Sequence, residues 1–164
     1  MAKKVYLDAR DSRVLLTLIG ISCHLKDYRL SYLLNYHLPA EFIRLEDLKI
    51  IPQTKKEPSE FSFYFFRDED RFNTYTLLSN RNQESVLIPE MKQTDFLLII
   101  EGEFRKPQKD VLLRNIRSIP SVLTSYEIKF TEIKNYETLL SEIELHVMKL
   151  FKEYKHKYQP VNKK

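Results

Sequence analysis

The sequence is poor in the residues that build the most recognisable enzyme sites: its 164 residues include two glycines, one cysteine and no tryptophan. With only Gly20 and Gly102, the chain has no glycine-rich phosphate loop, and the Walker-type, dinucleotide-binding and G-x-S-x-G motifs are absent. The lone cysteine, Cys23, excludes an internal disulfide framework, and no CxxC or HxxxH pair supports a tetrahedral zinc site. We therefore expect neither a cofactor nor a metal.

Long apolar runs are also missing. The longest uncharged apolar run, residues 96–100, is far shorter than the roughly 20 residues of a membrane-spanning helix. Near the N-terminus, Asp8 and Arg10 closely follow Lys3 and Lys4 and interrupt any apolar core of a signal peptide. Together with the lone cysteine, these features predict a cytoplasmic protein that does not bind membranes.

Aromatic residues are abundant, with ten Phe and ten Tyr in a chain that is 43% hydrophobic. This composition favours one ordered core over low-complexity linkers. The net charge is +4, but six lysines and one glutamate give the last sixteen residues +5, so the preceding 148 residues carry −1. We therefore predict a single α+β domain over residues 1–154 and a basic C-terminal tail over residues 155–164.

The N-terminal region predicts a strand followed by a helix. Between residues 5 and 21 the apolar pattern allows either a buried strand or a helix, and we favour a strand that Gly20 ends. Ser22 is a candidate N-cap for a helix over residues 25–38, which Pro39 closes. The helical period places Leu30, Leu33, Leu34 and Leu38 toward the core and Tyr28, Tyr32 and Tyr36 at its margin.

The centre of the chain predicts an antiparallel meander. Polar connectors at residues 67–70 and 79–84 separate apolar runs in a pattern typical of hairpins. Residues 51–60 have the composition of a surface loop, which we place within the one domain. The last run is apolar on both faces, as in a strand covered on both sides. The predicted strands are residues 61–66, 72–78, 86–88 and 96–100.

The C-terminal third predicts a crossover and a final helix. Pro107 begins a helix that reaches Ile116, and Pro120 prevents its continuation. A strand over residues 122–130 follows, and this spacing places it in one sheet with the strand at residues 96–100. A last helix starts near residue 135 and carries an apolar stripe of Tyr136, Leu139, Leu140, Ile143, Val147, Leu150 and Tyr154.

The strongest local signal is a proline-marked turn that leads into the apolar run at residues 96–100. This segment resembles the signature of the IPExxxVDY family, a bacterial family with no assigned biochemical activity. Thr94 and Phe96 stand where the signature names Val and Tyr, and a weaker resemblance extends over residues 18–130. The resemblance thus implies a relationship but no reaction. The residues that carry the motif are Ile88, Pro89, Glu90, Asp95 and Phe96.

The two motif carboxylates, Glu90 and Asp95, sit where a turn needs hydrogen-bond acceptors. We expect both to accept main-chain N–H bonds, which makes the motif structural. Binding or acid–base catalysis is the alternative, and catalysis requires two carboxyl groups that converge on one substrate. Glu101 and Glu103 share the face of Asp95, but Gly102 between them indicates a chain that is turning away, so we expect no cation there.

An enzyme site assembled from scattered residues would use Cys23, His24 and Asp27 together with the motif carboxylates. Adjacent side chains diverge, however, and a lone cysteine most often behaves as a small buried hydrophobe. We therefore predict no catalytic residue. Our leading hypothesis is a non-enzymatic interaction or accessory protein that self-associates or binds a protein partner.

The aromatic strand residues support either a core with an interface or a stacking surface for RNA. The middle of the chain is acidic, which argues against RNA at the strands and favours core and interface. An RNA-binding accessory protein remains the alternative, with salt-sensitive contacts from basic residues. The aromatic residues are Phe61, Phe63, Tyr64, Phe65, Phe72 and Tyr75; the basic ones are Lys149, Lys152, Lys155 and Lys157, with Arg105, Lys106, Lys109, Arg114 and Arg117 nearby.

Overall fold

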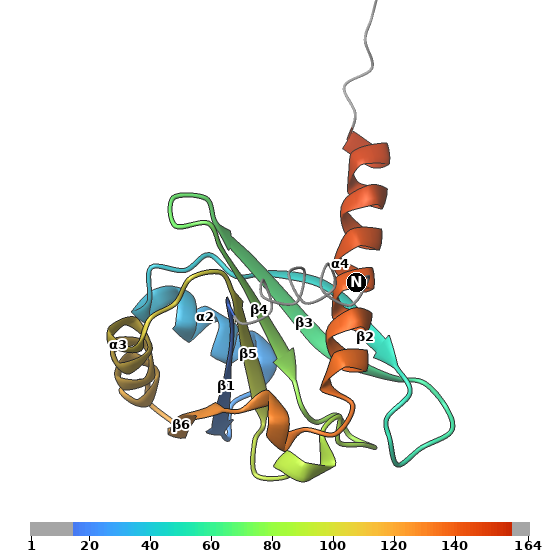
Figure 1. Cartoon of the computed structure of the whole chain (residues 1–164), viewed down its shortest axis with the longest axis horizontal. Helices are drawn as coiled ribbons and strands as arrows, with labels where there is room; N and C mark the ends of the chain where they lie inside the picture. Colours follow the sequence, from blue (N-terminus) through green and yellow to red (C-terminus); the bar gives the residue numbers. More distant parts are fainter. Residues whose placement is uncertain (1–14, 159–164) are drawn as a thin grey trace, which may run out of the picture.

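A computed structural model describes residues 15–158, which form one six-stranded antiparallel sheet with helices on both faces (Figure 1). The predicted single α+β domain is confirmed, and the strand order is β2-β3-β4-β5-β1-β6. The elements in chain order are β1 (Leu16–Cys23), α2 (Asp27–His37), β2 (Ile43–Ile50), β3 (Ser59–Asp68), β4 (Asn73–Ser79), the 3-10 turn η2 (Pro89–Met91), β5 (Phe96–Glu101), α3 (Lys106–Arg117), β6 (Val122–Ile128), the 3-10 turn η3 (Phe130–Glu132) and α4 (Tyr136–Tyr158).

The predicted meander is confirmed for β3, β4 and β5, which pair antiparallel in chain order. The strand predicted at residues 86–88 is wrong. Val86 makes only an isolated bridge to Arg81. The main-chain N–H groups of the next two residues donate hydrogen bonds to Asn80 and not to a neighbouring strand. Pro89 then begins η2, so this apolar run is buried as a turn.

The strand preferred over a helix for the N-terminal region is confirmed by β1. Residues 5–14, which that prediction also covered, lie outside the described residues. Gly20 does not end it, because β1 continues to Cys23 as an interior strand between β5 and β6. Gly20 is instead required by close packing, since a Cβ atom there would lie 2.8 Å from a side-chain carbon of Ile128. Ser22 is not the N-cap of α2; it lies within β1 and donates a hydrogen bond to the carbonyl of Gln93.

The predicted crossover is confirmed in outline. Strands β5 and β6 share the sheet, and because each pairs antiparallel with β1, they run parallel to one another with β1 between them. Strand β2 at the sheet edge was not predicted at all. Four of its eight residues are charged and a bulge between Leu45 and Leu48 breaks its alternation, so the period-two signal of a strand is lost.

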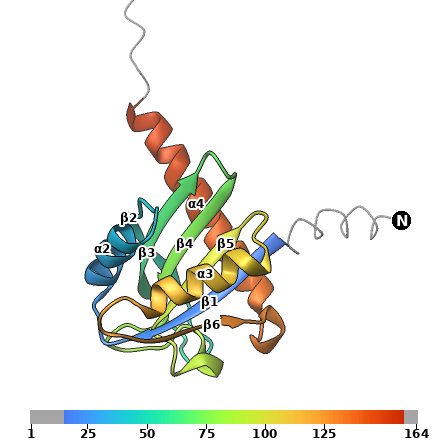
Figure 2. The same ribbon diagram turned by 90° about the vertical axis from the view of Figure 1, so that its left-hand side faces the viewer.

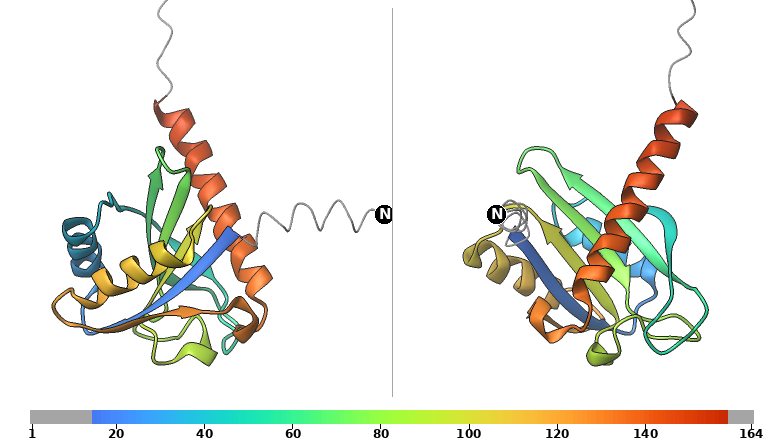
Figure 3. Two further views of the ribbon diagram at one scale, coloured as in Figure 1. Left: turned by 60° about the vertical axis from the view of Figure 1, so that its left-hand side comes forward. Right: turned by 45° about the vertical axis from the view of Figure 1, so that its right-hand side comes forward.

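The two faces of the sheet carry two separate cores. Helices α2 and α3 cover one face and α4 crosses the other, as Figures 2 and 3 show. Strand β3 divides its aromatic residues between them: Phe63 packs toward α4, whereas Tyr64 packs toward α2. Leu97 and Leu98 on β5 likewise enter opposite cores, which confirms that this strand is covered on both sides.

Helix α4 buries Ile143 against the sheet, and its C-terminal end projects beyond the sheet (Figures 1 and 3). The helix includes residues 155–158 of the predicted tail, while residues 159–164 lie outside the described residues. Neither α4 nor any other helix within residues 15–158 is long and apolar enough to cross a membrane.

Candidate functional site

The motif corner, residues 88–96, is built around the buried side chain of Asn80. Its amide group donates hydrogen bonds to the carbonyls of Met91 and Thr94, both at 2.9 Å, and its amide oxygen accepts the N–H of Ile88 at 2.8 Å. Thr94 is fully buried, and its hydroxyl group contacts that of Tyr126 on β6. One asparagine therefore satisfies three main-chain groups of a segment that has no regular ladder.

The two motif carboxylates have different surroundings. Asp95 Oδ2 accepts the N–H of Cys23 at 2.9 Å, and Asp95 Oδ1 lies 3.4 Å from Nε of Arg81. Glu90 departs from the expectation: it lies exposed on η2, and its carboxylate accepts no hydrogen bond from the described residues. The reason is local, because the amide of Met91 already bonds within the turn. The two carboxylates do not form a pair.

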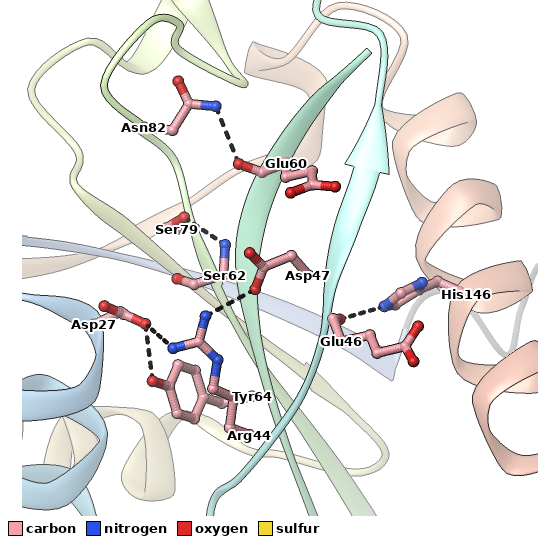
Figure 4. A network of polar contacts seen from close by, with 10 residues as sticks. All are labelled: Asp27, Arg44, Glu46, Asp47, Glu60, Ser62, Tyr64, Ser79, Asn82 and His146. Carbon is pink, nitrogen blue, oxygen red and sulfur yellow. Dashed lines mark hydrogen bonds and ion pairs between the residues drawn. The ribbon is translucent and has the colours of Figure 1, made fainter. Parts of the chain in front are cut away.

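An open polar cleft of about 470 Å³ lies at the N-terminal end of α2 (Figure 4 shows part of its wall). The structure brings Cys23, Asp27 and Asp95 to this cleft, but His24 and Glu90 do not line it. Three of the five candidates for a scattered enzyme site are thus neighbours. The charged side chains of the cleft are Lys26, Asp27, Arg44, Asp47, Glu60, Arg81 and Asp95.

Most of these charges are used within the cleft. Arg44 lies between two carboxylates, 3.2 Å from Asp27 and 3.1 Å from Asp47 (Figure 4). The hydroxyl group of Tyr64 donates to the same Asp27 oxygen at 2.9 Å. These contacts tie the start of α2 to the edge strand β2 and to β3, so the network has a clear structural role.

Two nucleophilic side chains at or beside the cleft, those of Cys23 and Tyr64, have raised pKa values. Burial raises the pKa of the Cys23 thiol, and the negative charge of Asp95 raises it further, although a hydrogen bond from the backbone of Leu25 acts the other way. Burial also raises the pKa of Tyr64, and its hydrogen bond to Asp27 adds to the shift. Both groups stay protonated near neutral pH, whereas covalent catalysis by cysteine needs a thiolate.

The acidic residues at the end of β5 turn apart as expected. Gly102 has a positive φ of 118°, and Glu103 is held 2.7 Å from Nε of Arg105. Among the side chains of residues 15–153, no group of three or more histidine, cysteine or acidic residues is arranged to hold a metal ion.

The described basic residues among those proposed for RNA binding lie on different elements, and several are engaged by acidic or main-chain groups. Lys149 lines a groove with the carboxylate residues Glu46, Asp47, Glu60 and Glu142, and Lys152 is exposed on α4. The side chains of Lys155 and Lys157 lie outside the described part of the chain. Near α3, Arg105 pairs with Glu103, Lys109 pairs with Glu127 and Arg117 donates to the carbonyl of Ser125.

Among the described residues, the most exposed aromatic side chains are three tyrosines of α2 and Phe72, which lies just before β4 and is 86% exposed. Phe61, Phe63, Tyr64 and Phe65 are buried. We call Tyr28, Tyr32 and Tyr36 the tyrosine face; these side chains follow one another at four-residue spacing and are 61%, 65% and 75% exposed. The sequence placed them at the margin of the core, and the structure turns them fully outward.

A second hollow lies at the other end of α2 and was not predicted. This aromatic pocket of about 340 Å³ is bounded by the residues after α2, by β3, β4 and β5, and by α3. Four of its rings, those of Phe42, Phe66, Tyr75 and Phe104, pack against one another at centroid distances between 5.4 and 6.4 Å. No short motif could reveal it, because its walls come from distant segments.

No model of a protein family matches the sequence, and no curated protein matches it.

Proposed function

We propose that this protein is a non-enzymatic interaction or accessory protein, and that it binds a protein partner through the tyrosine face of α2. The observation that carries the proposal is the exposure of Tyr28, Tyr32 and Tyr36 on one side of a single helix. Tyrosine is enriched at the centre of protein interfaces because its ring buries a large apolar area while its hydroxyl group finds a polar partner.

The opposite side of α2 makes this surface rigid. Leu30 and Leu34 are fully buried against the sheet, and Asp27 anchors the start of the helix to Arg44 and Tyr64. A helix held in this way presents its outer side chains at fixed positions, so less ordering entropy is lost when a partner binds. The polar cleft thereby supports the interface without taking part in chemistry.

The charges beside the tyrosines favour a partner with acidic residues. Lys26 and Arg29 are exposed on or next to α2, and the only carboxylate of the helix, that of Asp27, is engaged by the cleft. Two copies of α2 packed face to face would bring basic residues together without a complement. We therefore favour a different protein over self-association as the partner.

We also propose that the chain is a member of the IPExxxVDY family and works in the cytoplasm. The first proposal rests on Ile88, Pro89, Glu90 and Asp95, and on a corner that has a structural reason for Asp95. The second rests on the lone Cys23, which is buried as a free thiol. Neither proposal adds an activity.

The experiment is a comparison of two matched surface variants of the full chain. One replaces the three tyrosines of α2 by serine; the other replaces Leu145 and Met148, exposed at 60% and 62% on α4, by serine. Each variant is expressed in the cells that normally make the protein and is affinity-purified after chemical cross-linking. The mass of each purified variant in solution is measured by light scattering. We expect the α2 variant to lose the wild-type partner while the α4 variant retains it.

Two results contradict this proposal. A partner retained by the α2 variant and lost by the α4 variant moves the interface to the other face of the sheet. A wild-type protein that is strictly monomeric and recovers no partner removes the interaction function altogether.

A further inference from the structure

The aromatic pocket has the size and lining of a small-molecule site. Binding cavities for small ligands typically measure about 300 to 1,000 Å³ and are lined by apolar and aromatic groups with a few polar ones, and this pocket, at about 340 Å³, falls within that range. Its floor is made by Leu98 of β5 and its walls by the four packed rings and by Leu112 of α3. It is separate from both the polar cleft and the tyrosine face.

Several polar groups around the pocket have unused bonding capacity. Within residues 15–153, whose side chains are described, the hydroxyl group of Tyr75, the amide of Asn115 and the guanidinium of Arg71 make no side-chain hydrogen bond or ion pair. Asp68 differs, because its Oδ1 accepts the main-chain N–H groups of Asp70 and Arg71 at 3.1 and 3.2 Å. The turn is thus fixed with its carboxylate at the pocket mouth.

The charge at the mouth is predominantly negative. A shallow polar hollow adjoins the pocket and brings Glu41, Asp68, Glu69 and Asp70 together. Of the two arginines that line it, Arg67 places its guanidinium 5.8 Å from the ring of Phe151 on α4, on the opposite face of the sheet. Arg71 alone therefore opposes four carboxylates.

The field inside the pocket has the same sign. Burial raises the pKa of Tyr75, and the charge of Asp68 raises it further, against the smaller opposing effect of Arg71. Aromatic faces also attract cations and repel anions, because their quadrupole places negative charge on the ring face.

We infer that the aromatic pocket binds a small organic ammonium compound, with the apolar body of the ligand among the rings and its cationic group toward Asp68 and the acidic mouth. A carboxylate of the same shape would meet four acidic residues and a single arginine. This inference does not depend on the proposed function, since it concerns a different surface and needs no partner protein.

The test uses three probes that share one apolar body: 4-phenylbutylammonium, 4-phenylbutanol and 4-phenylbutanoate. Each is titrated into the full chain at pH 7 while the leucine and valine methyl signals are followed by NMR. We expect the ammonium compound to bind about tenfold tighter than the alcohol, the ratio for a cation–π and charge contribution of about 1.4 kcal/mol. The carboxylate should bind weakest.

Two variants locate the binding. Val111 is 48% exposed on α3 at the pocket wall, so Val111→Trp fills the pocket without disturbing the core and should abolish binding. Leu123→Trp, at a position 63% exposed on β6, is the matched control and should bind as the wild type does. Asp68→Asn keeps the acceptor of the turn but removes the charge, and should weaken binding of the ammonium probe alone.

Any of three outcomes overturns the inference. The first is that the alcohol or the carboxylate binds as tightly as the ammonium compound. The second is that none of the three probes binds at millimolar concentration. The third is that Val111→Trp binds the ammonium compound normally while remaining folded. Equal affinity of wild type and Asp68→Asn for the ammonium probe would also contradict the assigned orientation.

Discussion

The two ends of helix α2 border two hollows of opposite character. At its N-terminal end, the polar cleft gathers charged residues, but these have partners within the protein. Asp27 and Arg44 form an ion pair, and Asp95 accepts a main-chain N–H group. At its C-terminal end, the aromatic pocket holds fewer charges, but the hydroxyl group of Tyr75 and the guanidinium of Arg71 make no side-chain hydrogen bond or ion pair within the described residues. The polar groups of the cleft are therefore largely engaged within the protein, whereas several polar groups around the pocket make no side-chain hydrogen bond and are open to solvent or a ligand.

The motif corner positions Asp95 and Arg81 in the polar cleft, and removing the side chain that supports this corner should have the largest effect on stability. Asn80→Ala should lower the free energy of unfolding by about 3 kcal/mol or more, because it leaves three buried main-chain groups without a partner. Asn115→Ala, in the wall of the pocket, is the control and should be neutral or slightly stabilising, since its amide is unpaired and alanine favours helices. Urea unfolding of both variants measures the contrast, and equal losses would contradict it.

The carboxylates of the motif should differ in their effect on stability. Asp95→Ala should cost about 2 kcal/mol, because the N–H of Cys23 loses a charged acceptor, whereas Asp95→Asn retains an acceptor and should cost less. Glu90→Gln should change the free energy of unfolding by less than about 0.5 kcal/mol, as expected of an exposed side chain. Thermal unfolding of each variant measures the change in stability. A large loss of stability from Glu90→Gln alone would give that residue a role that the structure does not explain.

The thiol in the cleft should be unreactive. Because burial raises the pKa of Cys23, iodoacetamide should modify the native protein about tenfold more slowly than the urea-unfolded chain at pH 8. Mass spectrometry of timed samples gives the two rates. Faster modification of the native protein would indicate an activated thiolate and reopen an enzymatic function for the cleft.

Two tyrosines, one at each hollow, should show a smaller difference in the free energy of unfolding. Tyr64→Phe in the cleft should cost about 1 kcal/mol at pH 7 because Asp27 loses a donor, whereas Tyr75→Phe in the pocket should cost almost nothing. Burial raises the pKa of both phenols in the folded protein, so their contribution is complete below the usual tyrosine value of about 10 and falls as the pH rises above it. Each variant should therefore lose less stability than the wild type above about pH 10, as alkaline unfolding curves would show.

Much of the fold could be predicted because its elements have strong local patterns. The helix that ends before Pro39, the central meander and the doubly covered strand β5 all follow from apolar period and turn residues. Strand β2 was missed because an edge strand with one exposed face tolerates charges, and Gly20 misled because close packing, which sequence does not display, explains it better than a strand end.

The sites were harder to predict. Sequence reasoning named Cys23, Asp27 and Asp95 together, and the structure does bring them to one cleft, but it also supplies their partners, Arg44 and Arg81, which no motif marked. The aromatic pocket has no sequence signal, since its rings belong to ordinary core positions until the fold leaves a space between them.

We propose that the tyrosine face, and not the motif carboxylates, forms the surface that binds the partner. The most direct test of this proposal measures how much of the wild-type partner co-purifies with two variants, Glu90→Gln with Asp95→Asn, and the serine substitution of Tyr28, Tyr32 and Tyr36, by quantitative mass spectrometry. We expect the carboxylate variant to retain the partner and the tyrosine variant to lose it. Loss of the partner by the carboxylate variant, while the tyrosine variant still binds, would contradict the proposed interface.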